Sequence, residues 1–299
     1  MKNKNNYWIV LILISTLLSC SNDNSEGSQT PDIEPVENIV IEIKGARDIF
    51  PTWAKFQGKI TQNSTSNRLV GFVFSTNPNP IVNNSNTFTA SDYRIGISDL
   101  EFTSLTLLPN KVYYIKAFVK KDNTYIYSNE STFRTTGYFG PAGGYVGFDK
   151  GIITDGWRFM EIHPTTLNFS SAGVGAKWGA MNTFISGTYP DFGKGLENTN
   201  IIVNNTTDAN CAAKLCYNLT LNGFSDWYLP SIQEIFQITR ELRTAGINFP
   251  YDGWSSTQTN ADFAKSTFYN LGPLGSVPTF EIADGVKGNG NTVYPARRY

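Results

Sequence analysis

Aromatic, amide and carboxylate side chains gather in two stretches of the C-terminal half of the sequence. They are Trp178 and Asn182 in the first stretch, and Tyr251, Asp252, Trp254, Gln258, Asn260 and Asp262 in the second. An aromatic ring can stack on the apolar face of a sugar, while amides and carboxylates bind its hydroxyl groups. This composition therefore predicts a glycan-binding site.

The sequence contains few residues that could act as a nucleophilic pair or bind a metal ion. The sequence holds one histidine, His163, so a zinc site built from several imidazoles is excluded. Any Ser-His or Cys-His pair would have to use this residue, and no nucleophile or orienting partner lies near it in sequence. We interpret His163 as structural and predict that the protein is not an enzyme.

The N-terminus reads as a signal peptide over residues 1–19. A short positive region is followed by an apolar run over residues 7–18, which is shorter than the ~20 residues of a membrane-spanning helix. Leu17-Leu18-Ser19-Cys20 then matches the bacterial lipobox, so the chain resembles a lipoprotein precursor. The resemblance implies cleavage before Cys20 and lipidation of Cys20, whose acyl chains would anchor the protein to a membrane.

Residues 20–36 are polar and acidic without apolar periodicity, which predicts a flexible tether. Ser21 stands where an aspartate would suggest inner-membrane retention, so the lipoprotein resemblance favours the outer membrane, with the folded part facing the cell exterior.

Cys211 and Cys216 are the other two cysteines, and an exported protein favours a disulfide between them. On a continuous helix, however, their Cα atoms would lie near or beyond the ~7 Å limit for a disulfide. They can pair only if Cys211 precedes the helix or lies in its frayed first turn. Both outcomes stay open.

Length and charge narrow the classes of function. At 299 residues the chain can form two modest domains, each with its own core. Charged residues make up 16% of the sequence and the net charge is -1, so no basic surplus exists to neutralise phosphates. We therefore predict no nucleic-acid partner.

Short alternating segments separated by turn residues fill residues 37–136. The segments are 53–60, 68–75, 102–107, 111–120 and 124–133. None has a helical period, which predicts an antiparallel all-β sandwich. Leu107, Pro109 and Tyr113 occupy positions that resemble the tyrosine corner of fibronectin type III domains, and modules of that family usually act as spacers.

Residues 137–299 combine strands with helices. Residues 145–148 and 157–162 read as a hairpin, and Asp208 is placed to cap a helix through Leu219. Ser231 and Glu234 form a capping box for a second helix through Ala245, with Gly246 just beyond it. The strands expected after it are 263–271, 278–282 and 293–299. This pattern predicts an α+β domain.

Ordered motifs in this half carry a second resemblance. They include Gly156-Trp157-Arg158-Phe159-Met160-Glu161, Lys177-Trp178-Gly179, Asn222-Gly223-Phe224-Ser225-Asp226-Trp227-Tyr228-Leu229-Pro230-Ser231 and Ala296-Arg297-Arg298-Tyr299. Together they resemble the Lcl C-terminal-like domain, a family grouped with C-type-lectin-like folds. The resemblance implies two helices on a mostly antiparallel sheet and adhesin-type glycan binding. It also implies that Trp178 and Trp254 match family positions that fill the core.

Alternatives follow from the same resemblance. The partner could be a protein or another surface macromolecule in place of a glycan. A formylglycine-generating-type oxidase would need a cysteine pair near the C-terminal loops, whereas Cys211 and Cys216 lie on a predicted structural helix. Asp226 is a candidate calcium ligand, but no clustered carboxylates accompany it. Arg297 and Arg298 are expected to pair with carboxylates such as Glu161, Asp226 or Glu234.

Overall fold

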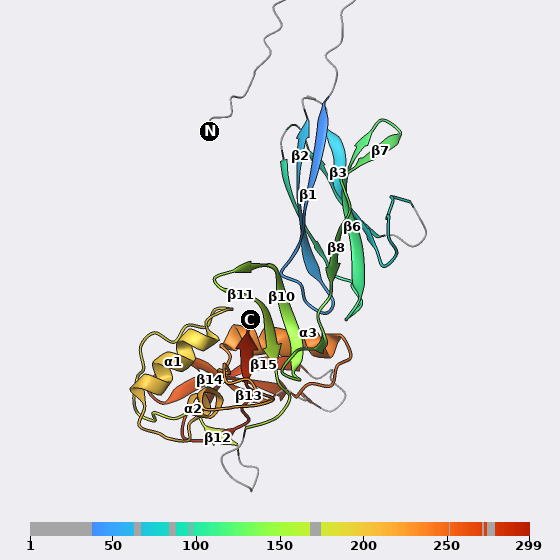
Figure 1. Cartoon of the computed structure of the whole chain (residues 1–299). Helices are drawn as coiled ribbons and strands as arrows, with labels where there is room; N and C mark the ends of the chain where they lie inside the picture. The colour runs from blue at the N-terminus through green and yellow to red at the C-terminus, as the bar shows by residue number, and fades with distance from the viewer. Residues whose placement is uncertain are drawn as a thin grey trace, which may run out of the picture. The chain divides into compact units, whose positions relative to one another are not determined.

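The computed structural model describes residues 38–62, 67–83, 88–94, 96, 98–167, 175–250, 252–270, 272–273 and 279–299 (Figure 1). These residues belong to one compact unit, Glu37–Tyr299. The predicted signal peptide, the lipidation site Cys20 and the tether lie outside the described residues. Within the described part of the chain, no helix is long and apolar enough to cross a membrane.

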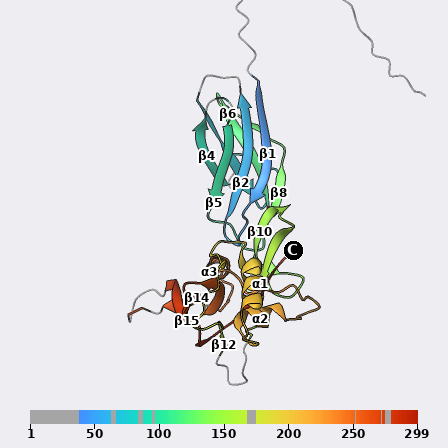
Figure 2. The same ribbon diagram turned by 90° about the vertical axis from the view of Figure 1, so that its left-hand side faces the viewer.

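The first part of the unit consists of antiparallel strands in two sheets (Figure 1, Figure 2). One sheet has the order β1-β2-β5, formed by β1 (Ile39–Arg47), β2 (Ala54–Gln62) and β5 (Ser98–Ser104). The other has the order β4-β3-β6-β7, with β8 also paired to β6; its strands are β3 (Arg68–Ser75), β4 (Phe88–Arg94), β6 (Val112–Lys121), β7 (Thr124–Tyr127) and β8 (Ser131–Arg134). The prediction that this part is built of antiparallel strands is confirmed.

Alternating apolar residues build the core between these sheets. Every second residue of β2 is buried, and the Phe56 ring contacts those of Phe72, Phe74 and Phe133 at centroid distances of 5.0–5.8 Å. Tyr113 is buried, and its hydroxyl accepts a hydrogen bond from the Leu108 N–H at 2.9 Å. This local bond is the one that a tyrosine corner makes.

The predicted strand over 124–133 is two strands in the structure. β7 pairs with residues 118–121 of β6, whereas β8 pairs with residues 112–115 of the same strand. β1 and β4 were not predicted, and β5 begins four residues earlier than the segment expected at 102–107.

The second part is mixed, with a small helical region followed by a C-terminal sheet. One antiparallel sheet has the order β17-β11-β10-β9, formed by β9 (Tyr138–Phe139), β10 (Tyr145–Thr154), β11 (Trp157–Ile162) and β17 (Ala296–Arg298). Another has the order β13-β14-β15, formed by β13 (Gly253–Gln258), β14 (Phe263–Asn270) and β15 (Thr279–Val286). A short pair joins β12 (Ala176–Lys177) to β16 (Gly290–Asn291). The predicted hairpin is therefore confirmed as β10–β11.

The described residues form three helices where the sequence predicted two. α3 (Ile232–Thr244) carries the predicted capping box, and Gly246 follows it with a φ of 78°. α2 (Ala212–Tyr217) begins after Cys211, so Asp208 is not its cap; the Asp208 carboxylate instead accepts the Ala180 N–H at 2.9 Å.

α1 (Gly195–Asn205) was missed because Asn, Thr and Gly give it low intrinsic helix propensity. Tertiary contacts stabilise it. The buried Asn198 amide bonds to the Tyr189 backbone, and the buried Thr199 hydroxyl bonds to the Leu229 backbone. The last strand is also shorter than predicted, because Pro295 cannot donate to a ladder.

Residues from the sandwich side complete the core of the second part. Phe50 is buried, and its ring lies 5.0 Å from Phe148 and 6.2 Å from Phe192. Ile49 exchanges two backbone hydrogen bonds with Asp149. This continuous packing fixes the sandwich strands against the β10–β11 hairpin.

Candidate functional site

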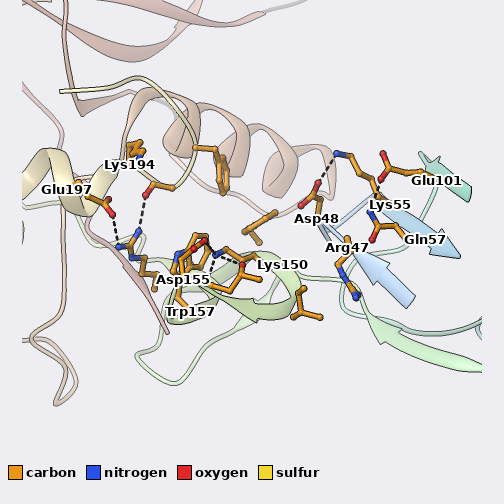
Figure 3. A pocket seen from close by; sticks show the side chains of 16 residues that line it. Arg47, Asp48, Lys55, Gln57, Glu101, Lys150, Asp155, Trp157, Lys194 and Glu197 are labelled. Atoms are coloured by element: carbon orange, nitrogen blue, oxygen red, sulfur yellow. Dashed lines mark hydrogen bonds and ion pairs between the residues drawn. The ribbon is translucent and has the colours of Figure 1, made fainter. Parts of the chain in front are cut away.

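A cleft of about 760 Å³ lies where the sandwich meets the β10–β11 hairpin and the start of α1 (Figure 3). From the sandwich strands and the turn after β1, its lining includes Arg47, Asp48, Lys55, Gln57 and Glu101. From the second part it includes Lys150, Thr154, Asp155, Trp157, Phe192, Lys194, Glu197 and Arg298. Segments far apart in the sequence therefore meet at one site.

Ion pairs hold the polar walls of the cleft. They join Lys55 to Asp48 at 2.8 Å, Lys150 to Asp155 at 3.4 Å and Arg298 to Glu197 at 3.0 Å. The hydrogen bond that Lys55 donates to Asp48 raises the pKa of the lysine. Because most of these groups remain partly exposed, the pairs add little to stability, but they fix the polar atoms that face the cleft.

Trp157 lies on the floor between cations. Trp157 is 6% exposed, and the Lys150 Nζ lies 3.6 Å from the centroid of its ring. The Arg298 guanidinium carbon lies 5.5 Å from the same centroid. Figure 3 shows Lys150, Asp155 and Trp157 together in the middle of the site. This part of the cleft therefore combines an aromatic side chain with two cationic hydrogen-bond donors.

Two cations at opposite ends of the cleft have no carboxylate partner among the described residues. Arg47 donates to the backbone oxygen of Ala46, and Lys194 is exposed (Figure 3). Their remaining N–H groups are available to acceptor atoms of a ligand. With the three ion pairs, these side chains line both ends with hydrogen-bonding groups.

A close backbone contact sets the position of the hairpin wall. Gly151 has a φ of 81°, and a Cβ at this position would lie 2.1 Å from the Ala46 carbonyl oxygen. The Asp149 carboxylate accepts the Gly151 N–H at 2.7 Å and binds Arg158 with both oxygens. A side chain at Gly151 would force the hairpin and the sandwich apart.

A buried carboxylate sets the position of the opposite wall. Glu234 of α3 accepts the N–H groups of Gly193 at 3.0 Å, Gly195 at 3.4 Å and Ser231 at 2.8 Å. Burial raises the pKa of Glu234 to about 7, although these donors favour its charged form. The loop that carries Lys194 is thereby tied to the start of α3.

The structure places Trp178 and Trp254 in the core. Both rings are essentially without exposed surface, and each indole N–H donates at 2.8 Å to a backbone oxygen, of Ser255 and Ala176 respectively. A ring with no exposed face cannot stack on a sugar. These tryptophans therefore do not form the platform that the sequence predicted.

The other predicted site residues hold loops together. Gln258 is buried, and its oxygen accepts from the Ile185 N–H at 3.0 Å and from the buried Lys287 Nζ at 2.6 Å. The pKa of Lys287 falls to about 8 because the charged amine is desolvated.

The predicted side chains nearer the surface accept hydrogen bonds from backbone N–H groups. Asp252 accepts the Tyr269 N–H, and Asn260 accepts the N–H groups of Asp262 and Phe263. Asn182 is exposed, whereas Tyr251 lies outside the described residues. None of the described members of the predicted set lines the cleft.

The two cysteines in the described part of the chain, Cys211 and Cys216, are buried, free thiols. Cys211 precedes α2 and Cys216 lies within it, and burial raises the pKa of both. A thiol with a raised pKa is a poor nucleophile.

His163 is buried, packs against Trp227 and has a pKa lowered by burial. In the described part of the chain, no group of three or more His, Cys, Asp and Glu residues could hold a metal ion.

The predicted pairing of Arg297 is confirmed. Its guanidinium binds both oxygens of Asp226 at 2.9 Å and reaches the fully buried Glu161 at 3.4 Å. Arg298 pairs with Glu197, a partner that was not predicted. Sequence reasoning also missed Lys150, Lys194 and the sandwich side of the cleft, because no motif links strands that meet only in the fold.

No family model matches this chain, and no curated protein matches it. Part of the chain structurally resembles the sensor domain of the anti-sigma factor RsgI4 in Pseudobacteroides cellulosolvens. A longer version of that domain is 24% identical, with a TM-score of 0.27, and the match covers 33% of this chain and 89% of the other. A shorter version is 23% identical, with a TM-score of 0.28, covering 34% of this chain and 97% of the other. The similarity is limited to a β-rich fold over about a third of this chain.

Proposed function

We propose that this chain is a lipid-anchored cell-surface binding protein that holds a glycan in the cleft between its two parts. The anchor is Cys20 and the tether is residues 20–36, by the lipobox resemblance of Leu17–Cys20. The outer membrane, with the folded unit directed outward, is the location that this resemblance favours. The fold assignments are a fibronectin type III-like sandwich over 37–136 and a C-type-lectin-like domain over 137–299.

The observation that carries the proposal is the lining of the cleft. Its volume of about 760 Å³ falls within the roughly 300–1,000 Å³ of small-ligand sites. The paired side chains already lie in place before a ligand binds. They therefore lose less conformational entropy on binding than unpaired side chains would. Hydroxyl-rich ligands suit such a wall, because each hydroxyl both donates and accepts a hydrogen bond.

The side chains that line the cleft are suited to binding a ligand rather than to catalysis. The cleft contains cations and carboxylates that are mostly paired with one another, and the buried thiols of Cys211 and Cys216 do not line it. The alternative partner is a protein of the envelope or of another cell.

A steric block inside the cleft tests the proposal. The full chain, solubilised in detergent, is applied to a broad glycan array with and without calcium. Thr154→Trp fills the cleft from its hairpin wall, and we expect it to weaken binding at least tenfold. Ile153→Trp is the matched control: Ile153 is 75% exposed, does not line the cleft, and points to the other face of the strand.

Several outcomes would contradict the proposal. Silence of the array, together with a stoichiometric protein partner whose capture sugars do not compete, would favour the protein-binding alternative. Equal loss of glycan binding in both tryptophan variants would mean that the sugar does not occupy the cleft. Near-ultraviolet circular dichroism establishes that both variants keep the fold.

A further inference from the structure

A second hollow adjoins the cleft at Arg298. It has a volume of about 310 Å³ and is lined by Leu196, Tyr217, Ser225, Asp226, Trp227 and Arg298. Arg298 lines both spaces, and the consecutive α1 residues Leu196 and Glu197 line the hollow and the cleft respectively. We call this space the Tyr217 hollow. The cleft and the Tyr217 hollow therefore meet at Arg298.

The Tyr217 hollow combines an exposed ring with a fixed carboxylate. Tyr217 is the last residue of α2 and is 50% exposed. The Asp226 side chain is 49% exposed, and its two oxygens are held by the Nε and Nη2 atoms of Arg297. Each oxygen keeps acceptor capacity toward the solvent side. Ser225, an exposed residue, also lines the hollow.

This set of groups matches the chemistry of one sugar ring. Stacking on Tyr217 would cover the apolar C–H face of the ring, and the Asp226 oxygens would accept hydrogen bonds from neighbouring hydroxyls. Because Arg297 already fixes the carboxylate, binding costs little side-chain entropy. At about 310 Å³ the hollow lies at the small end of ligand sites, which suits a single unit of a longer chain.

We infer that the ligand is an oligosaccharide long enough to occupy the cleft and the Tyr217 hollow together, passing over Arg298. This inference rests on the proposed glycan function, and it assigns a second subsite with Tyr217 as the stacking residue. The pair of Arg298 with Glu197 divides the two spaces and supplies hydrogen bonds to the unit that crosses it. Affinity should therefore increase with chain length until both spaces are filled.

Calorimetric titration of the full chain with homologous sugar series tests this inference. The probes are xylo-, manno-, cello- and malto-oligosaccharides and oligogalacturonides of one to six units. For a series that binds, we expect the hexasaccharide to bind at least tenfold more tightly than the disaccharide. Tyr217→Ala should weaken the hexasaccharide by about tenfold, the worth of a stacking contact, and leave the disaccharide unchanged.

Two control variants separate stacking from other effects. Tyr217→Phe keeps the ring and should keep the affinity for the hexasaccharide. Tyr189→Ala removes a tyrosine that is 56% exposed outside both spaces and should change nothing. Affinity that does not depend on chain length, or a Tyr217→Ala variant that binds the hexasaccharide normally, would overturn this inference while leaving the cleft as a glycan site. Silence of all five series, together with a silent array, would overturn both proposals.

Discussion

The two parts of the described structure bury their polar groups differently. In the sandwich, the core consists of aliphatic and aromatic side chains, and the buried polar residues are uncharged, such as Gln62 and Ser75. Among the described residues of the second part, six charged side chains are buried: Asp149, Glu161, Glu234, Glu241, Lys287 and Arg297. An apolar core follows the period of the strand, whereas a buried charge needs its own partner at one position.

This difference bears on the cleft. The sandwich presents its side of the site on regular strands, whereas the second part presents loops that buried charges tie down. Glu234 holds the loop around Lys194, and Asp149 holds the hairpin wall. We therefore expect that removing a buried charge disturbs the second part far more than removing an exposed charge disturbs the sandwich.

The largest effect is expected from Arg297→Ala. The change leaves Glu161, which has no exposed surface, without its cation, and unpairs Asp226. Loss of one partner of a buried pair costs about 3–5 kcal/mol, so the free energy of unfolding in urea should fall by that amount. In the sandwich, Lys44→Ala breaks an exposed pair with Asp99 and should give no resolvable change. Similar losses in the two variants would contradict the distinction between the parts.

A smaller effect is expected from the titration of Glu234. Its pKa rises from 4.5 in the unfolded chain to about 7 in the folded one, so the folded state binds the proton more tightly. Stability is then fully present below pH 4.5 and is lost as the pH rises toward 7, by roughly 3 kcal/mol. Urea unfolding at pH 4 and pH 8 measures this loss.

Glu234→Gln should remove most of that pH dependence. Burial also raises the pKa of Glu161, so a residual slope of the same sign should remain. Glu42→Gln, at an exposed position of β1, is the matched control and should keep the slope of the unaltered protein. A Glu234→Gln variant with an unchanged slope would show that this carboxyl does not carry the proton.

The smallest effect is expected at the start of α3. The Ser231 hydroxyl accepts the Glu234 N–H at 3.3 Å and donates to the Asp191 oxygen at 2.9 Å. Ser231→Ala should lower the free energy of unfolding by about 1 kcal/mol, the usual worth of a helix cap. Ser225→Ala, at an exposed position outside any helix, should leave the unfolding curve unchanged.

What the sequence predicts well are features with a local cause. The alternation around Phe56 and Phe72 predicts buried faces of strands, and the spacing of Ser231 and Glu234 predicts the start of α3. Trp227, inside the motif that runs from Asn222 to Ser231, is buried. α1 escapes prediction because Asn198 and Thr199 are stabilised by residues outside the helix.

The candidate site could not be predicted for a related reason. Arg47, Lys150 and Lys194 are ordinary surface cations in the sequence, and only the pairing of distant strands brings them to one cleft with Arg298. Trp178 and Trp254 have the composition of a binding platform, yet their indole N–H groups find buried backbone acceptors. Composition identifies residue types that suit a sugar, but burial decides which of them can reach one.

A structure of the full chain with a bound hexasaccharide would locate the ligand and so test the proposed glycan site. We expect sugar units in the cleft between Lys194 and Arg47, beside Trp157, with the sugar chain continuing over Arg298 toward Tyr217. Sugar bound instead at the exposed loops around Asn182, Asp252 and Asn260, with an empty cleft, would contradict it.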